Sequence, residues 1–226
     1  MTRTTSRSIQ FDNLKGDEDA SALVIKLMIS CNDLQLSNES LSDWKQDQPL
    51  KKKYRQTGAC MYFIRLQIGH LFEGLKILEQ INQNTFLKKV IKQCDAETQK
   101  SFEFLEQYFT KNSNERKRLE LIVGQIRHNL AFHYNETSKL IKAAIKDRAS
   151  REEAKHSTIT RGSEAYLWHF KPADDILDSI VVRQIWQIQR DNDLRVESDK
   201  IADEIHTIFL KYMDFSGEFI WKYFEK

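Results

Sequence analysis

The stretch GQIRHNLAFHYNE, from Gly124 to Glu136, places an arginine, two histidines and a tyrosine within eight residues. A guanidinium group can hold an anion through several N–H donors, and an imidazole titrates near neutrality and can transfer a proton. Two interpretations are open. The stretch is either the end of an amphipathic helix whose polar residues happen to lie close together, or an active site.

The apolar residues before the motif predict how a helix would present it. The residues that repeat at steps of three and four are Leu119, Ile122, Ile126 and Leu130, and His133 continues the same face. Arg127 lies beside this face, where an apolar residue would pack at a lower cost. Six residues of ideal helix separate Arg127 from His133 by about 120° and about 9 Å along the axis. One straight helix therefore cannot bring both side chains onto one small group, whereas a bend or a second copy of the helix could.

Composition predicts that helices position these residues. The chain has 226 residues, of which 40% are hydrophobic and 30% charged, with seven glycines and two prolines. So few turn-forming residues argue against a sandwich or a barrel, and Leu, Ile, Lys, Gln and Glu favour helix. We expect an all-α protein, an elongated bundle of six or seven helices.

Periodicity and capping residues predict the elements. We expect a disordered polar tail over residues 1–18 and a single domain over 19–226, with a mobile loop at about 150–163. The first helix is expected from Asp19 to about Leu36, with a polar turn or short second piece from Asn38 to Trp44. The other helices are expected at about Tyr54–Gln83, Thr85–Gln93, Glu97–Thr110, from Asn114 into the motif, and at Ser138–Ala149, Pro172–Arg190 and Val196–Phe224.

The helix expected over Tyr54–Gln83 carries further information. Gly69 and Gly74 weaken its helix propensity, which predicts that another helix approaches closely there. Arg65 and Glu73 lie off its apolar stripe, and a surface ion pair is one explanation for both.

The stretch RHNLAFH resembles the signature of the HEPN (higher eukaryote and prokaryote nucleotide-binding) superfamily. That signature is an arginine, a polar residue and, after a short spacer, a histidine, here Arg127, His128 and His133. The segments YFIRLQIGHLFEGLKIL and WHFKPADDI also resemble uncharacterised bacterial members. The resemblance covers about residues 54–186 and is specific only in these short stretches.

The resemblance implies a helical bundle that dimerises through the motif helices, and many members are metal-independent RNases. Arg127 would then bind the scissile phosphate and stabilise the transition state, and His133 would act as general acid and base. His128 and Asn129 would orient the site. The expected product of attack by the 2′-hydroxyl is a 2′,3′-cyclic phosphate, and no metal or cofactor is expected.

Two residues relate to the family pattern less directly. In toxin members a tyrosine that can be nucleotidylated lies two residues after the histidine, whereas Tyr134 follows His133 directly. Regulation through Tyr134 is therefore in doubt. Glu73 resembles the polar residue that an earlier helix contributes to the site in some members.

Net charge, cysteine spacing and the length of apolar segments limit which partners and which cellular location we expect. A net charge of +2 is not the broad basic field of a protein that holds nucleic acid by charge alone. Three widely spaced cysteines suit a reducing compartment, and no segment has the length of a membrane-spanning helix, so we expect a cytoplasmic protein. The expected partners are a second copy of the chain, RNA, and an antitoxin or regulatory protein in a defence setting. The alternatives are a non-catalytic helical module that binds RNA, nucleotide or a partner protein, and a bundle in which Arg127 and His133 are structural.

Overall fold

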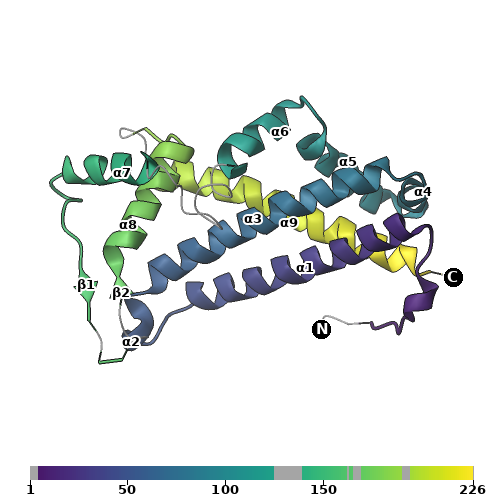
Figure 1. Cartoon of the computed structure of the whole chain (residues 1–226), viewed down its shortest axis with the longest axis horizontal. Coiled ribbons are helices and arrows are strands. Elements are labelled where there is room, and N and C mark those ends of the chain that lie inside the picture. Colours follow the sequence, from purple (N-terminus) through teal and green to yellow (C-terminus); the bar gives the residue numbers. More distant parts are fainter. Residues whose placement is uncertain (1–4, 125–138, 162, 165–168, 190–193, 226) are drawn as a thin grey trace.

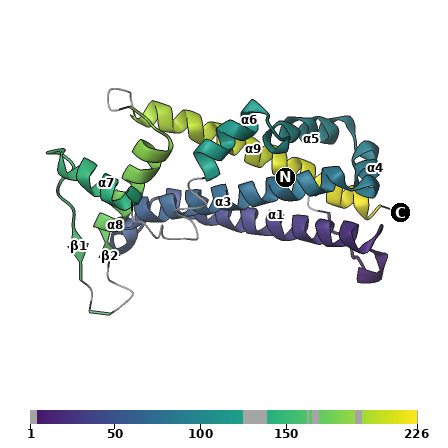
Figure 2. The same ribbon diagram turned by 45° about the horizontal axis from the view of Figure 1, so that its top comes forward.

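The computed structural model describes residues 5–124, 139–161, 163–164, 169–189 and 194–225. The described residues form an all-α bundle with one two-stranded sheet, which confirms the predicted fold class. The bundle is elongated (Figure 1), with α7 and α8 at one end and α4 and the C-terminal end of α9 at the other. A second view shows the same separation of the two ends (Figure 2).

Helix α1 (Glu18–Lys45) is longer than the sequence predicted. It begins at the N-cap Asp17, whose side chain accepts a hydrogen bond from the backbone N–H of Ala20 at 2.7 Å. The predicted break after Leu36 is wrong, because the buried face continues through Ser37 and Leu41. The Ser37 hydroxyl is satisfied by donating to the carbonyl of Leu34 at 2.9 Å.

Helix α3 (Gln56–Gln83) follows the short α2 (Leu50–Lys53) and packs along α1. Its predicted apolar stripe is confirmed in its second half, where the fully or almost fully buried residues are Ile68, Leu71, Leu75 and Leu78. Helix α9 (Leu194–Tyr223) packs against α1 and α3, so the long helices together enclose the core.

The close helix approach predicted at Gly74 is present. A Cβ atom added there would lie 2.6 Å from Oη of Tyr212 on α9 and 2.9 Å from Oγ of Ser30 on α1. The Tyr212 hydroxyl itself donates to Ser30 Oγ at 2.9 Å. The missing side chain of Gly74 therefore leaves room for a buried hydrogen bond that links α1 to α9.

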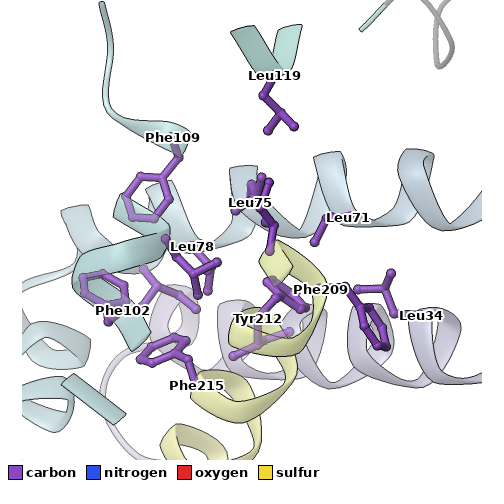
Figure 3. Close-up of a cluster of buried hydrophobic side chains, with 14 of the residues drawn as sticks. Leu34, Leu71, Leu75, Leu78, Phe102, Phe109, Leu119, Phe209, Tyr212 and Phe215 are labelled. Atoms are coloured by element: carbon purple, nitrogen blue, oxygen red, sulfur yellow. The ribbon is translucent and has the colours of Figure 1, made fainter. Parts of the chain in front are cut away.

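Three shorter helices cover one side of the bundle: α4 (Thr85–Gln93), α5 (Ala96–Phe109) and α6 (Asn114–Leu119). Each has a side-chain N-cap, provided by Asn84, Asp95 and Ser113 respectively. Figure 3 shows aromatic side chains of α5 and α9 meeting beside leucines of α3, and the rings of Phe102 and Phe215 are 4.8 Å apart.

At the other end lie α7 (Lys139–Ala149), α8 (Lys171–Ser179) and a π-helical segment, η5 (Ile180–Ile185). Strands β1 (Ile159–Thr160) and β2 (His169–Phe170) pair in antiparallel register, with Ile159 opposite Phe170. The predicted loop at 150–163 therefore contains one strand. Pro172 lies in the first turn of α8, as the sequence predicted.

The N-terminal segment differs from the predicted disordered tail over the residues that the structure describes. It contains a short 3₁₀ turn, η1 (Phe11–Asn13), and lies against the end of α9. The Arg7 guanidinium lies 4.1 Å from the ring centre of Trp221, and the Tyr223 hydroxyl donates to the carbonyl of Lys15 at 2.6 Å. The aromatic residues that end α9 thus give a polar segment contacts that its own composition did not predict.

Candidate functional site

The motif residues Arg127, His128, Asn129, His133 and Tyr134 lie in 125–138, outside the described residues. The structure describes the two elements that this segment joins. One is a π-helical segment, η2 (Glu120–Gly124), which continues α6, and the other is α7.

The segment η2 continues the core-facing side of α6 up to the motif. Leu119 and Val123 are buried, Ile122 is only partly buried and packs against the core, and Leu121 is exposed. Leu119, Ile122 and Val123 follow each other at steps of three and four residues from Leu119, so all three lie on the side that faces the core, with Ile122 at its margin. The predicted apolar face is therefore present at Leu119 and Ile122, and its continuation through Ile126 and Leu130 lies outside the described residues.

The same segment is anchored on the bundle. It packs against α3, and Figure 3 shows Leu119, the last residue of α6, pointing toward Leu75 of α3. On the other side of the motif, Nε2 of Gln184 in η5 donates to the backbone carbonyl of Leu140 in α7 at 2.9 Å. The motif therefore joins two elements that are each packed on another helix.

Glu73 lies on α3 at a half-exposed position, and its carboxylate is 3.2 Å from Nζ of Lys76. Its predicted contribution to the motif remains a prediction, because the motif lies outside the described residues. The predicted surface ion pair with Arg65 is wrong for Arg65, whose side chain is buried at 8% exposure.

Arg65 instead belongs to a partly buried charged cluster that sequence analysis missed. Its charge acts on Asp178 of α8, whose Oδ1 is buried and has no hydrogen-bond partner among the described residues. Burial raises the pKa of Asp178 to about 6. The charges of Arg65 and Arg148 oppose this increase, and the charges of Asp174 and Asp175 add to it. Asp178 is thus a carboxyl that exchanges a proton close to neutral pH.

The rest of this charged cluster ties α7 to α8. Asp147 of α7 lies 2.9 Å from Arg151 and accepts a hydrogen bond from the Ser179 hydroxyl at 3.4 Å. Asp175 accepts from Nζ of Lys171 at 2.8 Å. Burial alone would raise the pKa of Asp175. The hydrogen bonds from Lys171 and Ser157, together with the charge of Arg148, instead keep this pKa below its usual value.

These contacts were not predictable from spacing. Arg65 is on α3, Asp147 on α7 and Asp178 on α8, so only the packing of three helices brings the charges together. The sequence signals were an arginine beside an apolar stripe and the acidic run in KPADDILDS. Both patterns also occur in ordinary solvated helices.

Most described histidines have contacts that explain them structurally. His169 Nε2 lies 3.0 Å from Asp174 Oδ2, and its ring meets Tyr54 edge-on at 5.1 Å. His206 stacks on Phe209, and His70 lies 3.9 Å from Asp33. These contacts fix His169 beside the first turn of α8, close to the chain segment around Tyr54.

The described ranges contain no group of three or more His, Cys, Asp and Glu side chains that could hold a metal ion. Nor is any helix in them long and apolar enough to cross a membrane.

The chain was compared with known proteins at three levels. Comparison with protein-family models, with curated proteins and with solved structures finds no match.

Proposed function

We propose that the chain is a HEPN-like, metal-independent endoribonuclease with its site at Arg127 and His133. The observation that carries the proposal is the position of the motif directly after η2, a π-helical segment packed on α3. Such segments are rare, since π-helix accounts for well under 1% of residues, and they occur frequently at functional sites. A π-helical segment at that point supports a role for the following side chains beyond filling the core.

The mechanism follows from the residue types. The guanidinium of Arg127 binds the scissile phosphodiester and stabilises the additional negative charge of the transition state. The imidazole of His133 takes the proton of the 2′-hydroxyl and protonates the leaving 5′-oxygen. His128 and Asn129 orient the phosphate. The products are a 2′,3′-cyclic phosphate and a 5′-hydroxyl, so the bond count balances without a metal ion or an added nucleophile.

The active form in this proposal is a cytoplasmic homodimer in which two copies of the motif share one cleft. Sharing resolves the difficulty that one straight helix holds Arg127 and His133 about 120° apart. A protein partner such as an antitoxin would act by covering this cleft.

The test measures cleavage of single-stranded RNA in the presence of EDTA. Wild type is compared with Arg127→Ala, His133→Ala and a control, His156→Ala, which removes an exposed histidine of the described loop. Cleavage by wild type and the control, its loss in the two motif variants and a cyclic phosphate at the new 3′ end are expected. Equal cleavage by all four proteins would refute the assignment.

Mixing the two inactive variants tests the shared cleft. A heterodimer of Arg127→Ala with His133→Ala retains one intact Arg127 and one intact His133, so partial recovery of cleavage is expected. If wild type cleaves but the mixture stays inactive, the site lies within one subunit. If no protein cleaves yet RNA, nucleotide or a partner protein binds, the chain is the non-catalytic module.

A further inference from the structure

The exposed face of α7 carries a row of lysines directly after the motif. Lys139, Lys142 and Lys146 are all exposed and follow each other at steps of three and four residues. At 100° per residue they fall within about 60° of one another around the helix, over about 10 Å of its length. We call Lys142 and Lys146, with Lys139 at their end, the lysine row.

The acidic side chain of α7 points away from the lysine row. Asp147 is the one acidic residue in KLIKAAIKDRA, and it contacts Arg151 and Ser179 on the side of α7 that packs on α8 and η5. Ala144, fully buried, marks that same inner side. Among the described residues, Lys142 and Lys146 form no ion pair, so their charges are available to a ligand.

The chemistry of the lysine row favours a polyanion. The whole chain carries a net charge of only +2, so attraction of a polyanion depends on a local concentration of positive charge rather than on the overall field. Ammonium groups on one helix face bind phosphates as point charges and release counterions, with no requirement for base sequence.

We propose that the lysine row of α7 binds the phosphate backbone of a single-stranded RNA that extends from the motif. The proposal rests on the proposed function for its choice of RNA, and α7 begins six residues after His133 in the chain. The row contributes affinity without sequence preference, while the motif acts on the phosphate to be cleaved.

The test measures binding of a fluorescently labelled single-stranded RNA by anisotropy. All proteins carry His133→Ala, which prevents cleavage but leaves Arg127 in place. The test variant adds Lys142→Gln and Lys146→Gln, and the matched control adds Lys88→Gln and Lys89→Gln on α4. The control lysines are also exposed and lie at the opposite end of the bundle (Figure 1).

The row variant is expected to bind RNA about 5- to 20-fold more weakly, whereas the control keeps the parent affinity. Loss of two phosphate contacts lowers the slope of log affinity against log salt by about 1.4, since each contact contributes about 0.7 on a single strand. Equal affinity and slope in the row variant and the control would overturn the proposal. Absence of RNA binding by the parent protein would also overturn the proposal. Polyglutamate that displaces the labelled RNA as well as unlabelled RNA does would overturn it too, and would indicate an acidic protein partner.

These outcomes are separate from those of the proposed function. If RNA binding depends on Lys142 and Lys146 but wild type does not cleave, the lysine row is supported as an RNA-binding site and the proposed nuclease activity is refuted. If cleavage depends on Arg127 and His133 but RNA binding is unchanged by the lysine substitutions, the nuclease activity is supported and the role of the lysine row is refuted.

Discussion

Replacement of Asp178 by asparagine tests the energetics of the charged cluster. Burial raises the pKa of Asp178 from an ordinary value of 3.8 to about 6, even though Arg65 favours the charged form. A carboxyl whose pKa is raised by folding adds stability that is fully present below the unfolded pKa and is lost as the pH rises through the folded value. Asp178 therefore stabilises the fold below about pH 4 and loses that contribution by about pH 7.

The magnitude follows from the two pKa values. Between about pH 8 and about pH 5, protonation of Asp178 adds up to about 1.4 kcal/mol to the free energy of unfolding, and partial solvent access reduces this to about 1 kcal/mol. Asparagine has nearly the same shape and no charge at either pH. Asp178→Asn is therefore expected to have a higher free energy of unfolding than wild type near pH 8. Near pH 5 this difference between the two proteins is expected to be smaller by about 1 kcal/mol.

Urea unfolding of both proteins at the two pH values, at one ionic strength, measures this gap. Asp175→Asn is the matched control, because Asp175 is a neighbouring carboxyl on the same helix whose pKa is lowered. The control is expected to be less stable than its wild type near pH 8. If Asp178→Asn is also destabilised, and equally so at both pH values, then Asp178 and Arg65 form a net stabilising ion pair and the reasoning from burial is refuted.

Two further predictions concern the core. Gly74→Ala is expected to lower the free energy of unfolding by about 1–3 kcal/mol, the usual cost of overpacking, whereas Gly217→Ala, with nothing within 4 Å of the added Cβ, is expected to raise it by about 0.5–1 kcal/mol. Thermal unfolding compares the two, and equal effects would contradict the close helix approach. Burial raises the pKa of Cys31 and of Cys94 to about 11 each, so both thiols are expected to react with iodoacetamide near pH 7 much more slowly than in urea. Mass spectrometry of the labelled peptides measures this, and labelling of either at the unfolded rate would show that its environment is not the one described.

The sequence was sufficient for much of the fold because helix signals are local. The caps at Asn84, Asp95 and Ser113 each bond to a backbone N–H three residues away, so a short window of sequence contains the whole interaction. The apolar stripe of α3 is similarly a property of one segment. Where a segment is polar, as after Leu36 in α1, the local signal is weak, and burial of Leu41 decided that the helix continues.

For the candidate site, the sequence determined the residue types: an arginine and two histidines in a short motif, and lysines at helical spacing after it. Only the tertiary structure decided that a π-helical segment precedes the motif and that Asp147 turns inward, away from the lysines. It also decided that Arg65 meets a buried carboxyl of α8. The physical reason is that a helix fixes which residues share a face within a few turns, whereas the environment of each face depends on which distant helix packs against it.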